Sequence, residues 1–229
     1  MDVDRQGVLT VVVGNVCRWD GNAVSALEAL AATGRGLSGD VRVVVVELEG
    51  SVAASDDSVA GSVLSGLSEE ECDAVLASFQ DAVAWFRRAD TVTVATARGR
   101  LSGPAVELAL LCDLRLVAHD ASFALSDPPL LGVTSRLAAL IGAGRAAELA
   151  LTGRSVAAAE AERLGLATRV VPGSDLPAAT DELVAGLLAT DRATLTETKA
   201  LYAHLRAPRD QAAAERESFA RLTRPSAAD

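Results

Sequence analysis

The hydrophobic pattern at the start of the chain predicts alternating strands and helices. Residues 8–13 form a short run rich in valine, and residues 41–48 contain four consecutive valines, which is typical of a strand buried on both faces. Between these runs, residues 22–32 carry apolar side chains at helical spacing. The chain therefore opens as strand, helix and strand, which we interpret as the beginning of a right-handed βαβ unit.

A long polar segment interrupts this pattern at residues 50–66. It is rich in serine, glycine and aspartate and has no helical period. Because it is longer than most connections within a compact domain, we interpret it as a functional loop. Ser68 then begins a Ser-Glu-Glu-Glu sequence that places Glu71 in the position of a capping box. This signature predicts a helix that begins after Ser68, and residues 91–97 predict the next strand.

In the second half of the chain the predicted elements are short and follow one another closely. The expected elements are a helix at 105–112, extended segments at 114–117 and 123–125, helices near 135–141, 143–151 and 156–164, and a strand at 168–171. From residue 175 onward the chain is helical, rich in alanine and charged, and it shows no strand pattern. We therefore divide the chain into a core at residues 1–172 and a C-terminal helical oligomerisation region at 173–229.

The composition favours an α/β protein built on small side chains. Half of the 229 residues are hydrophobic but only 3% are aromatic, so alanine, valine and leucine must form most of the core. The formal net charge of −10 argues against nucleic acid and anionic membranes as partners. It does not exclude an anionic small molecule, because a local basic cluster outweighs distant charges at physiological salt.

The three cysteines, Cys17, Cys72 and Cys112, show no metal-ligand spacing. We interpret them as buried free thiols in a reducing compartment. The sequence contains no apolar run as long as a membrane span and no signal-type segment at its start. We therefore expect a cytoplasmic protein without a metal site.

Five segments of the second half resemble the enoyl-CoA hydratase/isomerase (crotonase) family in order and spacing. They are Glu107-Leu-Ala-Leu-Leu-Cys112-Asp113-Leu-Arg-Leu, Ala121-Ser-Phe123, Gly142-Ala-Gly144-Arg145 through Leu151-Thr152-Gly153-Arg154, Ala158 through Leu164-Gly165-Leu166, and Val170-Val171-Pro172. The resemblance implies a crotonase-like α/β spiral of ββα units with a C-terminal helical layer. It also implies homotrimers or hexamers, and an acyl-CoA thioester as the substrate. No separate cofactor is implied, since coenzyme A is part of that substrate.

In this family two backbone N–H groups stabilise the oxyanion that forms at the thioester carbonyl. The resemblance places the loop donor at Ala53. It places the helix donor at Pro104, and proline has no N–H. Either Gly103 or Ala105 supplies an N–H from a shifted position, or the oxyanion hole has a single donor.

The resemblance also implies two catalytic carboxylates, which align with Glu107 and Asp127. The alternative is that Glu107 is an ordinary acid near a helix N-terminus and that Asp127 is a turn residue before two prolines. The segment that lines the acyl pocket in the family is shorter here and lacks its glycines, so we expect a reshaped acyl site. Three arginines, Arg18, Arg98 and Arg100, are candidates for binding the phosphates of coenzyme A; the alternative is that they are solvated loop residues.

Three functions follow from these residues. The first is an acyl-CoA enzyme of hydratase or isomerase type that uses Glu107 as acid and base. The second is a non-catalytic crotonase-fold subunit or acyl-binding protein, which the proline at position 104 motivates. The third is a serine hydrolase related to the Clp-type proteases, since Ser102 precedes a helix and His119 follows it.

Overall fold

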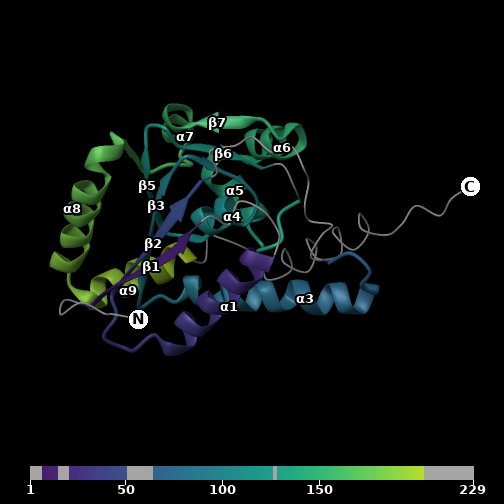
Figure 1. The fold of residues 1–229 in the computed structure, drawn as a ribbon. Helices are drawn as coiled ribbons and strands as arrows, with labels where there is room; N and C mark the ends of the chain where they lie inside the picture. The colour runs from purple at the N-terminus through teal and green to yellow at the C-terminus, as the bar shows by residue number, and fades with distance from the viewer. Residues whose placement is uncertain (1–6, 15–20, 51–63, 126–127, 204–229) are drawn as a thin grey trace, which may run out of the picture.

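The computed structural model describes residues 7–14, 21–50, 64–125 and 128–203, and it contains two β-sheets (Figure 1). The larger sheet is parallel throughout and has the strand order β1-β2-β3-β5-β8. Its strands are β1 (Val8–Gly14), β2 (Val43–Glu49), β3 (Val92–Arg98), β5 (Leu114–Ala118) and β8 (Arg169–Val171). All five lie where the sequence predicts strands.

The smaller sheet has the order β4-β6-β7. Its strands are β4 (Arg100–Leu101), β6 (Ser122–Ala124) and β7 (Ser155–Ala157). Strand β6 pairs parallel with β4 and antiparallel with β7. The prediction of a helix beginning at residue 156 is wrong by two residues, because Val156 pairs with Phe123 in the small sheet and the helix begins at Ala158.

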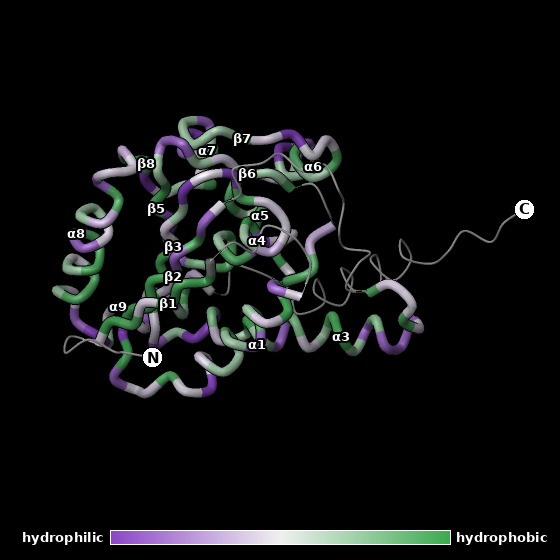
Figure 2. Tube along the Cα trace, viewed as in Figure 1, coloured by the Kyte–Doolittle hydropathy of each residue, from purple (hydrophilic) through white to green (hydrophobic). Residues whose placement is uncertain are grey.

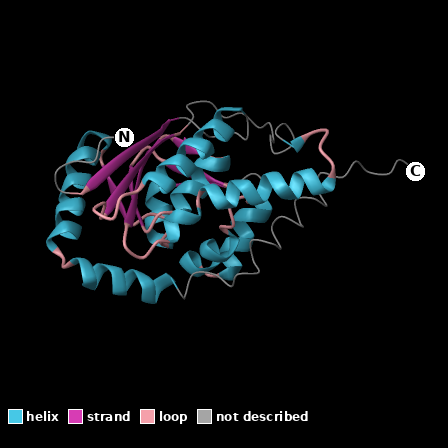
Figure 3. Ribbon diagram, turned by 90° about the horizontal axis from the view of Figure 1, so that it is seen from below, coloured by secondary structure: helices cyan, strands magenta, loops and turns pink. Residues whose placement is uncertain are grey.

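Helices cover both faces of the parallel sheet. The described helices are α1 (Gly21–Gly36), α3 (Glu69–Ala82), α4 (Gly103–Leu111), α5 (Thr134–Ile141), α6 (Ala143–Thr152), α7 (Ala158–Leu164), α8 (Leu176–Ala189) and α9 (Arg192–Ala203), with short 3₁₀ turns η1 (Ala84–Arg87) and η2 (Gly173–Asp175). Figure 1 shows α8 on one side of the sheet and α1, α3 and α4 on the other. Figure 3 shows the same layers from below. The valine-rich strands are hydrophobic because both faces are covered (Figure 2).

Alternate residues of β2 contribute to two separate cores. Val44, Val46 and Leu48 belong to the main core, which includes α4, whereas Val43 and Val45 pack in a second core with α8. Helix α8 therefore packs directly on the sheet. The division of the chain at residue 172 and the oligomerisation role of the region after it stay predictions. None of the helices in the described ranges combines the length and hydropathy that crossing a bilayer requires.

The capping box predicted at Ser68 is present at the start of α3. The Ser68 Oγ accepts a hydrogen bond from the Glu71 N–H at 3.3 Å, and the Ser68 N–H donates to the Glu71 carboxylate at 2.7 Å. These bonds hold the pKa of the Glu71 carboxyl below its usual value. Two N–H groups at the helix start are thereby satisfied.

Replacing Ser68 by alanine is expected to lower the free energy of unfolding by about 1 kcal/mol, because the Glu71 N–H loses its acceptor. Urea denaturation followed by circular dichroism measures this change. Ser78→Ala, an exposed position on the same helix, is the matched control and is expected to leave stability unchanged or slightly higher. Equal losses in the two variants would contradict the capping role.

Candidate active site

The candidate active site lies where β2 and β3 end and α4 begins. After β3 the chain turns at Gly99, forms the two residues of β4, and enters α4 at Gly103; both glycines have positive φ angles, 68° and 48°. Gly50, which follows β2, lies against this turn, since a Cβ at Gly50 would come within 2.4 Å of the Arg100 nitrogen. Because only glycine permits that approach, the end of β2 is held close to the segment that leads into α4.

Helix α4 is the central helix of the protein, and all nine of its residues are buried. Pro104 lies in its first turn, where the missing N–H costs the helix nothing. The Ala105 N–H donates to the Ser102 carbonyl at 3.1 Å, so it already has an acceptor in this turn. Of the two substitute donors considered for the oxyanion hole, Gly103 is therefore the better candidate.

Glu107 lies one turn into α4, three residues after Pro104, and it is only 2% exposed. Residues with this spacing share one face of a helix. One carboxylate oxygen accepts two backbone hydrogen bonds, from the Leu130 N–H at 2.9 Å and the Leu131 N–H at 2.6 Å. These donors compensate for the loss of water around a buried charge. Glu107 therefore connects α4 to the segment before α5.

The segment that contains Leu130 is also held from α3. The Gln80 side-chain amide donates to the Leu130 carbonyl at 3.1 Å, while Glu107 accepts from its N–H. This segment corresponds to the part of the chain where the sequence predicts a reshaped acyl site. The structure thus fixes its backbone through one polar side chain from each of two helices.

Three of the residues predicted for the site, Ala53, Asp127 and Arg18, lie outside the described residues. Each of the three follows a strand that the structure describes. Strand β2 ends at Glu49, before Ala53, and β1 ends at Gly14, before Arg18. In the small sheet Leu101 pairs with Phe123, so β6, which precedes Asp127, ends beside the start of α4.

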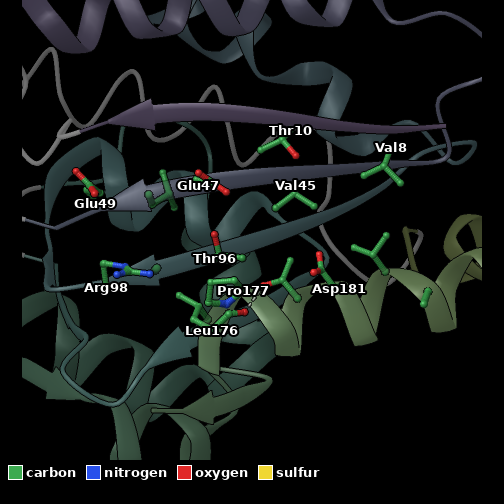
Figure 4. A pocket seen from close by; sticks show the side chains of 15 residues that line it. Val8, Thr10, Val45, Glu47, Glu49, Thr96, Arg98, Leu176, Pro177 and Asp181 are labelled. Atoms are coloured by element: carbon green, nitrogen blue, oxygen red, sulfur yellow. Dashed lines mark hydrogen bonds between the residues drawn. The ribbon is translucent and has the colours of Figure 1, made fainter. Parts of the chain in front are cut away.

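Arg98 and Arg100 lie in different surroundings. Arg98 lines a groove of about 710 Å³ between the sheet and α8, on the face opposite α4 (Figure 4). Glu49 stands opposite Arg98 in the strand register and lines the same groove, as do Glu47 and Thr96. Arg100 is half-buried on β4, opposite Ser122 and closer to the start of α4. The structure therefore does not bring Arg98 together with Pro104 and Glu107, and coenzyme A binding by either arginine stays a prediction.

The two residues of the serine-hydrolase alternative lie on different elements of the fold. Ser102 is the N-cap of α4. His119 follows β5 in an exposed turn, where its backbone N–H donates to the Val171 carbonyl at 2.9 Å. In the described part of the chain, no group of three His, Cys, Asp or Glu side chains is arranged to hold a metal ion.

Three buried cations near the carboxyl end of α4 were not identified from the sequence. The Arg115 guanidinium donates to the Cys112 carbonyl at 2.6 Å, and Arg136 donates to the same oxygen. Lys199, from α9, forms an ion pair of 2.7 Å with Asp113. Positive charge at this end of the helix is favourable because it complements the helix dipole.

The prediction of buried free thiols is confirmed for Cys72 and Cys112; Cys17 lies outside the described residues. Burial raises the pKa of the Cys112 thiol to about 12. We therefore expect iodoacetamide at pH 8 to leave Cys112 unmodified in the native protein and to modify it in urea, as measured by peptide mass spectrometry. Rapid native labelling of Cys112 would show that α4 opens to solvent.

Comparison with known proteins identifies the family. A family model described as enoyl-CoA hydratase/isomerase matches residues 37–225. The chain belongs to this family. Its parallel sheet and helical layers also match solved family structures. It is similar to a putative enoyl-CoA hydratase from Thermobifida fusca YX, solved in complex with acetoacetyl-CoA, with 35% identity, a TM-score of 0.71, and coverage of 90% of this chain and 85% of that one.

Other members show how far the similarity extends. An enoyl-CoA hydratase from Mycobacterium avium subsp. paratuberculosis K-10 has the same fold, with a TM-score of 0.78 at 24% identity over 96% of this chain and 92% of that one. The probable enoyl-CoA hydratase echA8 of Mycobacterium tuberculosis is 44% identical over 91 residues, which is 38% of this chain and 35% of that protein. The chain thus spans about a third of the length of this curated relative. The family match gives no support to the serine-hydrolase alternative.

Proposed function

We propose that this protein binds an acyl-CoA thioester and catalyses a hydratase or isomerase reaction through an enolate-like oxyanion. The observation that carries this proposal is the position of Glu107. It is a buried carboxylate one turn into α4, on the same face of the helix as Pro104 in the first turn. A helix N-terminus favours negative charge, and the carboxylate beside it can accept or deliver a proton. The two groups are those that enolate chemistry requires.

The proposed oxyanion hole combines the Ala53 N–H with the first turn of α4. A full pair of donors would include the residue at position 104, which has no N–H here. Loss of one such donor typically removes about 2.7–4 kcal/mol of transition-state stabilisation. We therefore expect slow turnover unless Gly103 takes the donor role.

Glu107 is proposed as the acid and base, with Asp127 as the second carboxylate. The two N–H groups that bind one oxygen of Glu107 fix the orientation of the carboxylate. A positioned base of this kind contributes roughly 10²–10⁴-fold to a rate. The Thermobifida fusca relative was solved with acetoacetyl-CoA, which supports a CoA thioester as the ligand class. Homotrimers or hexamers and a cytoplasmic location belong to the same proposal.

Pro104 supports one alternative, a crotonase-fold protein that binds acyl-CoA without turning it over. This function needs the scaffold and the CoA site but not a second oxyanion donor. It predicts binding of acyl-CoA with no reaction, and no effect of the Glu107 side chain on the bound thioester.

Calorimetry with CoA and acetyl-CoA, followed by turnover of crotonyl-CoA and a panel of acyl-CoAs, tests both functions on the full chain. Saturable binding with turnover supports the enzyme. Binding without turnover at high protein concentration supports the alternative. Absence of both would refute the acyl-CoA function altogether.

A further inference from the structure

Helix α9 is attached to the rest of the protein in an unusual way. Among its described residues 192–202, Lys199 is the only one whose side chain is buried, and it is 7% exposed. Surface helices normally pack through an apolar stripe, and lysine is among the residues least often buried. Leu201 and Tyr202 of the same helix are instead 69% and 58% exposed. The one fully buried side chain among the described residues of this helix is therefore a charged one.

Lys199 is also the only lysine in the sequence; the other twenty of the 21 lysine and arginine residues are arginine. Its ammonium group has three N–H donors, and three oxygens surround it. They are the Phe86 carbonyl at 3.0 Å, the Thr91 carbonyl at 2.6 Å and the Asp113 carboxylate at 2.7 Å. A compact ammonium matches three converging acceptors, whereas a planar guanidinium does not.

Two of these acceptors, Thr91 and Asp113, lie at the two ends of one continuous unit, and Phe86 lies just before it in η1. Thr91 comes directly before β3, and Asp113 follows α4. The unit between them contains β3, the turn at Gly99, β4 and α4, and therefore both Pro104 and Glu107. Lys199 thus connects the beginning and the end of the segment that carries the candidate site.

Asp113 also binds directly to strand β3 of the parallel sheet, through Thr93. Its carboxylate also accepts from the Thr93 N–H at 2.9 Å and from the Thr93 hydroxyl at 3.0 Å, while the Asp113 N–H donates to the Thr93 carbonyl at 2.9 Å. Helix α4 is short and wholly buried, so a displacement at its carboxyl end moves its first turn as well.

We infer that Lys199 is a positioning residue for the active site: it fixes α4 relative to β3, and through it α9 helps to hold the site in place. This inference rests on the proposed function for its kinetic effect. Its structural effect, which is to keep residues 91–113 well ordered, does not depend on any activity.

The test compares Lys199→Met with Glu197→Gln, an exposed charge on the same helix that serves as the control. Lys199→Met is expected to reduce kcat roughly 10- to 100-fold with KM changed far less, since a displacement of about 1 Å has an effect of this size. Hydrogen exchange followed by mass spectrometry is expected to accelerate within residues 91–113 more than elsewhere. Glu197→Gln is expected to match the wild type in both measurements.

A second pair of variants separates positioning from a general loss of stability. Lys199→Met leaves the Asp113 charge buried without its cation, and adding Asp113→Asn removes that charge. The double variant is expected to recover stability but not kcat, and it also serves if the single variant fails to fold. Wild-type kcat in a folded variant, or exchange that rises equally over the whole chain, would overturn the inference. If the wild type shows no turnover, the proposed function fails, and the exchange pattern alone decides the role of Lys199.

Discussion

Glu107→Gln is expected to reduce kcat for the acyl-CoA reaction by roughly 10²–10⁴-fold while the protein stays folded. The amide oxygen of glutamine can still accept the hydrogen bonds from the Leu130 and Leu131 N–H groups, so the connection between α4 and that segment is preserved. The amide cannot act as a base at neutral pH, however. Steady-state kinetics with the best acyl-CoA substrate and a thermal melt measure the two effects separately.

Glu107→Ala is the companion variant, because it removes the anchor as well as the base. It leaves two buried N–H groups without their acceptor, and each unsatisfied group costs about 1–3 kcal/mol of stability. We expect a clear loss of stability in this variant and little loss in Glu107→Gln. Full activity in Glu107→Gln would assign Glu107 a structural role only.

Pro104→Gly is expected to increase kcat, by as much as 10²–10³-fold if the restored N–H completes the oxyanion hole. The residue lies in the first turn of α4, at the position where the resemblance to the family places the helix donor. The change carries a stability cost of about 1 kcal/mol, because glycine has greater freedom in the unfolded chain. Kinetics of the variant and its melting temperature measure the gain and the cost.

Pro177→Gly provides the matched control, since Pro177 occupies the equivalent first-turn position in α8. It changes the same residue type in a helix that packs on the opposite face of the sheet. We expect a similar stability cost and no change in kcat. If Pro104→Gly is no faster than the wild type, the missing donor does not limit the reaction, and Gly103 already supplies it or the chemistry does not use it.

Local sequence patterns predicted most of the described fold because burial and helix capping leave their signals within each segment. The valine run of β2 reflects a strand covered on both faces, and the serine at position 68 satisfies N–H groups within the same helix. Strand β7 was missed because its three residues carry too little pattern to reveal a strand.

The site was predicted less completely than the fold. Glu107 was found because its family motif is intact, but its partners are backbone N–H groups, which any residue provides. Lys199 was missed because most of its partners are also backbone groups: two of its three acceptors are main-chain carbonyls. Only side chains are visible in a sequence, so a side chain that binds backbone gives no paired signal. Arg98 lies in the groove because alternate residues of β3 point to opposite faces of the sheet, and its position places it on the α8 face.

The ion pair between Lys199 and Asp113 also affects when the candidate site can finish folding while the chain is being synthesised. Thr91 leaves the ribosome 108 residues before Lys199, and Asp113 also precedes it by a long stretch of chain. A nascent chain that ends before α9 therefore contains the strands of the parallel sheet but lacks the cation for a carboxylate that the finished protein buries. The sheet can assemble early, and the segment with Pro104 and Glu107 reaches its final order only when the last described helix has been made.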